Sequence, residues 1–202
     1  LSYSSMSSGD GSISMTGSAT GFGWGVRLYA SSLASTGGDI GLIGTAANGY
    51  GIALDSDSSP GSSITTGSGK ISLVGNGAYA GVVLGDYSAI TSGSGAVEID
   101  GRGTTGAGVR LVSSSSVNAG SGTVVLRAGN DGNSDAIVLD GSITSTTAVN
   151  LRPLDEADTI LLGAGNGFSV GNSDLANIHS PWLVIGSAQQ QGAIQVIDAL
   201  VY

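Results

Sequence analysis

A glycine-and-aliphatic repeat constrains this chain more than any other feature of its sequence. Each repeat opens with a small residue followed by alternating aliphatics, passes through a polar, glycine-rich stretch, and then gives an aliphatic-x-Leu triplet. The opening segments are GSISM, GDIGL, GKISL, GAVEI, GTVVL and TAVNL, which start at Gly11, Gly38, Gly69, Gly95, Gly122 and Thr147. These starts are 27, 31, 26, 27 and 25 residues apart, and a period of this size is the signature of a solenoid.

Three short strands are predicted in every repeat. The first two are the opening segment and the triplet, where apolar residues follow the two-residue period of a strand. The third contains a lone aliphatic that follows the triplet in five repeats: Leu33, Ile64, Ile90, Val117 and Ile143. No strand of this length buries a face alone, so the repeats are expected to stack as coils whose equivalent aliphatics share one core.

The repeat therefore predicts an all-β fold, a right-handed parallel β-helix. About six coils are expected over residues 1–162, and residues 163–202, where the period breaks, are expected to form an irregular C-terminal closing unit of the same solenoid. A β-sandwich is the alternative, but its strands need not share one repeated sequence. Within the closing unit, residues 183–186 and 193–197 are predicted strands, and Ser173 is a candidate N-cap for a short helix.

The two ends of the predicted solenoid differ. Terminal coils of a β-helix expose unpaired backbone, which invites strand addition unless a cap covers it. The first coil has no obvious cap, whereas the tail with Trp182 is expected to cover the C-terminal end. End-to-end self-association through the N-terminal edge is therefore predicted.

Charge and composition exclude several classes of partner. Fifteen acidic and six basic residues give a net charge of −9 with no basic cluster, so nucleic acid would be repelled. A hydrophobic fraction of 40% indicates a folded chain rather than a disordered one. Cysteine is absent, and no stretch approaches the roughly 18 apolar residues of a membrane span. The first residues lack signal-peptide features, so Leu1 is expected to begin a piece of something longer.

One glycine-rich stretch imitates a nucleotide-binding motif. Residues 101–106, GRGTTG, match the G-x-G-x-x-G phosphate fingerprint and follow a predicted strand. That fingerprint requires a helix after it, with its N-terminus facing the phosphates, whereas GVRLV follows here and reads as a strand. The repeat places residues 101–106 in the turn between the first two strands of a coil. Nucleotide binding is therefore not expected.

Aromatic residues are scarce, yet three of them recur near one position of the repeat. Trp24 and Tyr50 each lie two residues before the aliphatic that opens the triplet, and Tyr79 lies one residue further back. In stacked coils these side chains share one turn. Flat aromatic rings on an exposed ridge suit the apolar faces of sugar rings, so the three are predicted to form a glycan-contacting strip. The alternative is an aromatic stack that only stiffens the turn.

Carboxylates suitable for catalysis do not converge in the predicted fold. Polysaccharide lyases and hydrolases also use β-helices, but their chemistry needs two groups within a few ångströms of one bond. Asp55 and Asp140 hold equivalent positions in coils that lie about 14 Å apart. Glu98 and Asp100 share one strand, but Asp100 falls beside Arg127 of the next coil, which predicts a surface ion pair.

The remaining residues offer no alternative catalytic group. His179 is the only histidine, and no G-x-S-x-G nucleophile elbow is present. No catalytic residue and no organic cofactor are predicted, and the protein is not expected to be an enzyme.

One loop has part of a calcium-binding pattern. Asp131, Asn133 and Asp135 have the one-three-five oxygen spacing of a calcium loop. Ala136 stands where that loop needs glycine, and Ser142 stands where the bidentate Glu belongs. Asp and Asn also favour tight turns for their own reasons, so calcium is kept as a minor alternative.

Coils such as GKISLVGNGA and GTVVLRAGN, together with the tail NLRPLDEADTILLG…LANIHSPWLVIGSAQQQGAIQV, resemble the filamentous-haemagglutinin-like exoproteins. These are large β-helical adhesins that Gram-negative bacteria export by two-partner secretion. The resemblance covers most of the chain and implies an extracellular or cell-surface location and a role in attachment to host or matrix components. It implies no catalytic residues. A carbohydrate-active β-helix enzyme and a self-assembling filament subunit are the alternative functions.

Overall fold

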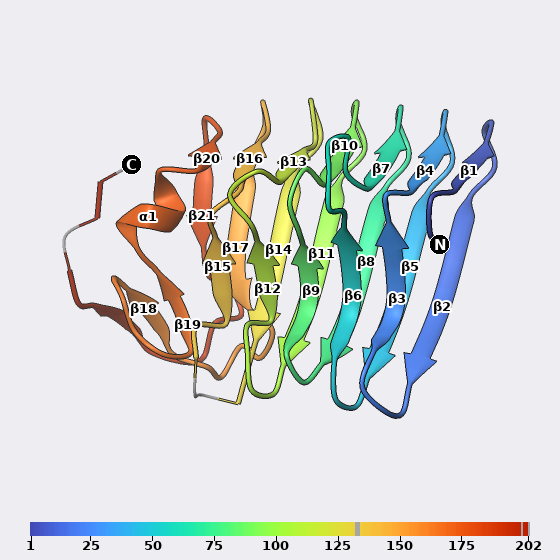
Figure 1. Cartoon of the computed structure of the whole chain (residues 1–202). Coiled ribbons are helices and arrows are strands. Elements are labelled where there is room, and N and C mark those ends of the chain that lie inside the picture. The colour runs from blue at the N-terminus through green and yellow to red at the C-terminus, as the bar shows by residue number, and fades with distance from the viewer. Residues whose placement is uncertain (132–133, 199, 202) are drawn as a thin grey trace.

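The chain winds into a right-handed parallel β-helix, which confirms the predicted fold (Figure 1). The computed structural model describes residues 1–131, 134–198 and 200–201. Three parallel sheets run along the solenoid, and a coil consists of one strand from each, in the chain order sheet I, sheet II, sheet III. Five coils are complete, because sheet II has five strands while sheets I and III have seven each.

The strands of the three sheets are named here with their bounds. Sheet I contains β2 (Ile13–Ala19), β5 (Ile40–Ala46), β8 (Ile71–Gly77), β11 (Val97–Gly103), β14 (Val124–Gly129), β17 (Val149–Pro153) and β21 (Leu183–Ile185). Sheet II contains β3 (Trp24–Tyr29), β6 (Tyr50–Asp55), β9 (Ala80–Leu84), β12 (Val109–Leu111) and β15 (Ile137–Leu139). Sheet III contains β1 (Ser5–Ser8), β4 (Ser32–Ser35), β7 (Ser63–Thr66), β10 (Ala89–Ser92), β13 (Ser116–Asn118), β16 (Ser142–Thr144) and β20 (Ile178–His179).

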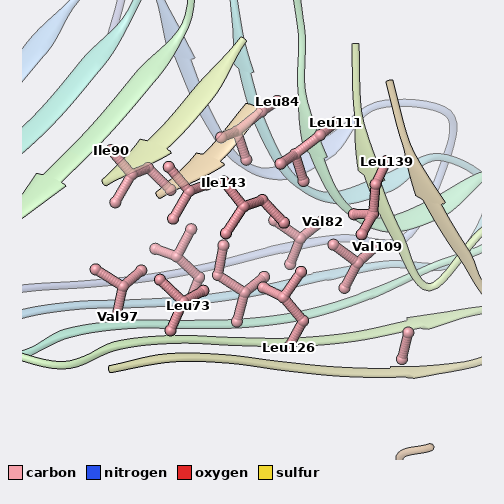
Figure 2. Close-up of a cluster of buried hydrophobic side chains, with 14 of the residues drawn as sticks. Leu73, Val82, Leu84, Ile90, Val97, Val109, Leu111, Leu126, Leu139 and Ile143 are labelled. Atoms are coloured by element: carbon pink, nitrogen blue, oxygen red, sulfur yellow. The ribbon is translucent and has the colours of Figure 1, made fainter. Parts of the chain in front are cut away.

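Aliphatic columns fill the interior of the solenoid. Strand pairing aligns equivalent residues of successive repeats, so that Leu42 lies beside Leu73 and Leu73 beside Ile99. Figure 2 shows side chains from the three sheets converging on one core. The inward-facing residues predicted for sheet I are all fully buried: Ile40, Leu42, Ile71, Leu73, Val97, Ile99, Val124 and Leu126. The lone aliphatics of the third strands are buried as well: Leu33, Ile64, Ile90, Val117 and Ile143.

Pairs of glycines bring sheets I and II into backbone contact at one corner of each coil. A Cβ added to Gly44 would lie 2.0 Å from the carbonyl oxygen of Gly51, which no real side chain tolerates. The same pairing occurs in the first four coils: Gly17 with Gly25, Gly44 with Gly51, Gly75 with Gly81, and Gly101 with Gly108. In the fifth coil, the register places Ala128 and Ala136 at these two positions. The paired glycines therefore set the narrow cross-section of the first four coils.

The nucleotide-like GRGTTG stretch belongs partly to this corner. Gly101 and Gly103 lie in β11, and only Thr104 to Gly106 forms the turn, so the assignment of the whole stretch to a turn was wrong in its first half. Strand β12 follows, as predicted, in place of a helix. Gly101 is required for close packing against Gly108 and has no phosphate-binding geometry.

A column of buried hydroxyls closes the corner between sheets III and I. Each hydroxyl donates a hydrogen bond to the carbonyl of the glycine that opens its own repeat, one turn of the solenoid earlier: Ser35 to Gly11 at 3.1 Å, Thr66 to Gly38 at 3.2 Å, Ser92 to Gly69 at 3.3 Å, and Ser145 to Gly122 at 2.7 Å. These bonds satisfy backbone carbonyls that would otherwise be buried without a partner.

Sheet II ends at β15, and two side chains from a short helix and the residues after it bond to the last residue of β15 in place of a further strand. Strand β18 (Ile160–Leu162) leaves sheet II and pairs with β19 (Phe168–Val170) and β22 (Ile194–Val196). Helix α1 (Asn172–Leu175) then places Asp174 Oδ1 3.0 Å from the Leu139 N–H, while Asn177 Nδ2 donates to the Leu139 carbonyl at 2.7 Å. Burial raises the pKa of Asp174, although its carboxylate accepts two backbone hydrogen bonds.

Two expectations for the closing unit need correction. The N-cap of α1 is Gly171 rather than Ser173, and Asp174 Oδ2 accepts a hydrogen bond from the Gly171 N–H at 2.9 Å. Trp182 is 72% exposed and does not cover the C-terminal end. Both predicted strands of this unit are present, as β21 and β22. In the described residues, no helix has the length and apolarity needed to span a membrane.

Neighbouring residues of β11 test the register. Replacing the fully buried Ile99 with Asn should lower the free energy of unfolding by about 3–5 kcal/mol, because an amide would be buried without a partner. Replacing the outward-facing Glu98 with Gln should lower it by less than about 1 kcal/mol. Denaturant unfolding of both variants measures the difference, and equal losses would contradict the register.

Two glycines of β5 test the backbone contact. Gly44→Ala should destabilise the protein by at least about 2 kcal/mol, because the new methyl group would collide with the Gly51 carbonyl. Gly41→Ala is the matched control, since a Cβ at Gly41 meets nothing within 4 Å and should leave stability unchanged or raise it by up to about 1 kcal/mol. Similar unfolding midpoints for the two variants would show that the paired glycines do not limit the approach of the sheets.

Candidate binding groove

A groove of about 740 Å³ runs along the outer face of sheet II. Its floor follows from the strand period, because the middle residue of each aliphatic-x-Leu triplet faces outward while its neighbours face the core. Register aligns these middle residues in one column: Arg27, Ala53, Val83, Arg110 and Val138. Four of the five line the groove, and three of these, Ala53, Val83 and Val138, are apolar, so the groove has an apolar floor interrupted by Arg110.

The predicted aromatic strip forms one wall of this groove. Trp24 lies opposite Tyr50 in the pairing of β3 with β6, and the Tyr50 and Tyr79 rings are 5.9 Å apart with a 59° tilt. Trp24 is 40% exposed and Tyr79 is 49% exposed, so ring surface remains available to a ligand. The structure therefore brings the three predicted residues together, and their role in contacting glycans stays a prediction.

A second hollow lies on the other side of the strip. It has a volume of about 240 Å³ and is lined by Phe22 together with the strip residues Trp24, Tyr50 and Tyr79. Phe22 is 82% exposed. The strip is thus a ridge between two hollows, and it offers aromatic surface to both.

Arg27 lies beside the groove, in contact with its lining residues Trp24 and Asp55, and is held in place. Its guanidinium carbon lies 4.1 Å from the Trp24 ring centroid and 4.6 Å from that of Tyr29. Its Nε and Nη2 donate to the Asp55 carboxylate at 3.0–3.2 Å. Aromatic faces and a carboxylate together fix this side chain, so its charge is neutralised within the wall.

Arg110 and Asp135 are the other charged groups of the groove. Arg110 is exposed on β12 and makes no hydrogen bond or ion pair within the described residues. Asp135 lines the far end, where its Oδ1 accepts a long hydrogen bond of 3.4 Å from Ser169 Oγ. The groove thus contains a cation without an ion-pair partner among the described residues, and a carboxylate at its end.

The calcium hypothesis involves this same end of the groove. Asp131 and Asp135 are exposed, while Asn133 lies outside the described residues. In the described parts of the chain, no group of three or more acidic, histidine or cysteine residues is placed to hold a metal ion. The three-oxygen pattern at Asp131, Asn133 and Asp135 stays a prediction from sequence.

An ion-pair ladder occupies the outer face of sheet I. Lys70 Nζ lies 2.9 Å from Glu98, and Arg127 contacts Asp100 at 2.6 Å and Glu98 at 3.5 Å. The predicted pairing of Asp100 with Arg127 is confirmed. Burial alone would raise the pKa of Glu98. The positive charges of Lys70 and Arg127 lower it by more than that, so the pKa lies below the ordinary value of 4.5. These carboxylates stabilise the stacking of coils and lie on a different sheet from the groove.

Sequence reasoning located the strip but did not identify the groove floor. The signal that could have found it is the middle residue of the triplets, since Ala53, Val83 and Val138 are apolar although they face outward. An outward apolar column on one sheet is typical of a binding surface.

Comparison with protein-family models, with curated proteins and with solved structures finds no match for this chain. The resemblance to filamentous-haemagglutinin-like exoproteins therefore stays a prediction. Any function must be argued from the geometry of the solenoid and its groove.

The ion-pair ladder of sheet I predicts that the free energy of unfolding depends on pH. The native pKa of Glu98 is lowered, so its stabilising contribution is complete above about pH 4.5 and is lost as the pH falls through the lowered value. The difference in unfolding free energy between wild type and Glu98→Gln should be at most about 1 kcal/mol at pH 7 and should vanish at low pH. A difference that grows on acidification would contradict this assignment.

Proposed function

We propose that this chain is a binding segment of a secreted or surface-displayed bacterial adhesin, whose solenoid presents the sheet II groove to glycans of a host or matrix. The observation that carries the proposal is the aromatic strip of Trp24, Tyr50 and Tyr79 along the wall of an open groove. The resemblance to the adhesin family supports the same assignment.

The chemistry of the strip fits sugar rings. Pyranose rings have apolar faces of C–H groups and a rim of hydroxyls, so they stack on aromatic side chains while polar groups nearby set their orientation. The strip supplies ring faces, and Asp55, Arg110 and Asp135 supply polar groups along the same groove. The groove crosses all five strands of sheet II, which gives room for an extended oligosaccharide.

The spacing of the groove carboxylates favours binding over glycoside cleavage. Asp55 belongs to the second coil and Asp135 to the fifth, so three coil spacings, about 14 Å, separate them along the solenoid axis. Glycosidases hold their two carboxyl groups within about 10 Å of each other. Asp55 is also engaged by Arg27. A non-catalytic role in attachment therefore fits this groove better than hydrolysis.

A glycan array tests the function. Wild-type protein should bind a subset of glycans, and the Trp24→Ala, Tyr50→Ala double variant should bind them at least ten times more weakly, because the stacking faces are removed. Trp182→Ala is the matched control: this residue is 72% exposed and does not line the groove, so binding should be unchanged. Unfolding midpoints must be measured for all three proteins.

Two results would contradict the function. One is a wild-type protein that binds no glycan on the array. The other is a double variant that loses stability and binding in proportion, which would make the strip a structural stack.

A further inference from the structure

Arg110 is the basic residue that lines the groove and forms no ion pair within the described residues. Of the six basic residues, Arg27, Lys70 and Arg127 form ion pairs. Arg110 is exposed in the groove and has no such partner among the described residues. An arginine directed into a groove with an apolar floor is a group available to a ligand.

Comparison with Arg27 explains why Arg110 is free. The two arginines occupy the same column of sheet II, three coils apart, and each has an aspartate two residues further along the next strand, Asp55 for Arg27 and Asp140 for Arg110. Only Arg27 forms the ion pair.

The neighbours of the two arginines account for this difference. Arg27 lies against the rings of Trp24 and Tyr29, which hold its guanidinium toward Asp55. The equivalent neighbours of Arg110 are Ala107 and Val112, which line the groove and provide no aromatic face. Arg110 therefore has an aspartate at the same register position as Arg27 but lacks the aromatic rings that fix the Arg27 side chain.

We propose that the groove selects oligosaccharides carrying a carboxylate, with a sugar ring on the aromatic strip and the carboxylate bound by the Arg110 guanidinium. This inference rests on the proposed function. Guanidinium and carboxylate form two parallel charge-assisted hydrogen bonds, which are stronger than bonds to neutral hydroxyls. Val83 and Val138 flank Arg110 on the neighbouring strands and offer apolar surface to the sugar that carries the carboxylate.

The distance between strip and cation bears on the length of the ligand. Tyr79 lies one strand across from Arg110 and four residues earlier in register, since Val83 is the partner of Arg110. The two Cα atoms are thus about 14 Å apart. The stacking surface and the cation therefore lie at separate places along the groove, which suits an oligosaccharide whose carboxylate is on a unit other than the stacked ring.

The acidic character of the chain does not prevent such binding. Asp55 is paired with Arg27. In the fifth coil, Asp135 lines the groove and Asp140 is exposed two residues beyond Val138, the strand partner of Arg110. At physiological salt the Debye length is about 8 Å, so carboxylates on the distant ion ladder are largely screened. Asp140 competes with the ligand for Arg110, and its removal should strengthen binding.

The test compares an acidic oligosaccharide with its uncharged counterpart. Tetragalacturonate and its methyl ester share one backbone, and a galactan tetrasaccharide sulfate provides a second anion; all three are titrated against wild-type protein at 0.15 M salt by calorimetry, about the physiological ionic strength. Wild type should bind the free acid at least ten times more tightly than the ester, and also more tightly than the sulfate.

Variants locate the preference at Arg110. Arg110→Met should remove the preference for the acid and leave binding of the ester unchanged, while Asp140→Asn should tighten binding of the acid. Arg102→Met is the control, because it removes the same charge from a residue that does not line the groove.

The outcomes separate this inference from the proposed function. If the ester and the acid bind equally and both depend on Trp24 and Tyr50, the adhesin function stands and the carboxylate preference is wrong. If the sulfate binds as well as the acid through Arg110, recognition of carboxylate as such is wrong. If none of the probes binds and the array is also blank, both proposals are overturned.

Discussion

The backbone hydrogen bonds between successive coils are the interaction on which the rest of this structure depends. They run along the solenoid axis and hold each strand to the equivalent strand of the next repeat, so inward-facing aliphatics stack in columns. Such a ladder requires every coil to have the same cross-section, and the paired glycines of sheets I and II impose it. Where Ala128 and Ala136 take those positions, sheet II ends with the strand of that same coil, β15, and the closing unit begins.

The outer faces of two sheets have separate roles. Sheet I places its charges in a ladder of mutual ion pairs around Glu98 and Arg127, which satisfies them within the protein. Sheet II leaves an apolar column open and keeps Arg110 unpaired within the described residues. Four charged residues, Lys70, Glu98, Asp100 and Arg127, thus hold neighbouring coils together on sheet I, while Arg110 on sheet II is available for recognition.

Much of the fold could be predicted because a repeat fixes alternation and register together. Ile99 must face inward if Leu73 does, and Asp100 must then meet Arg127. The strip could be predicted for the same reason. The role of Gly101 could not, because turn propensity and close packing both favour glycine, and only the facing strand distinguishes them. Arg110 has no ion pair within the described residues because Ala107 and Val112 stand where Arg27 has Trp24 and Tyr29. That difference is present in the sequence, but its meaning depends on the ring contacts of Arg27, which only the structure gives.

The axial direction of the hydrogen bonds has a mechanical consequence. A pull that separates the two ends of the solenoid loads the bonds of a terminal coil first, while the coils behind it stay intact. The chain would therefore yield one coil at a time, and a 27-residue coil releases about 90 Å of extended polypeptide. The paired glycines of sheets I and II give the first four coils one geometry, so each of these coils should release a similar length of chain. Under tension, such a solenoid would absorb energy each time one coil unfolds, while the coils that remain folded keep the groove intact.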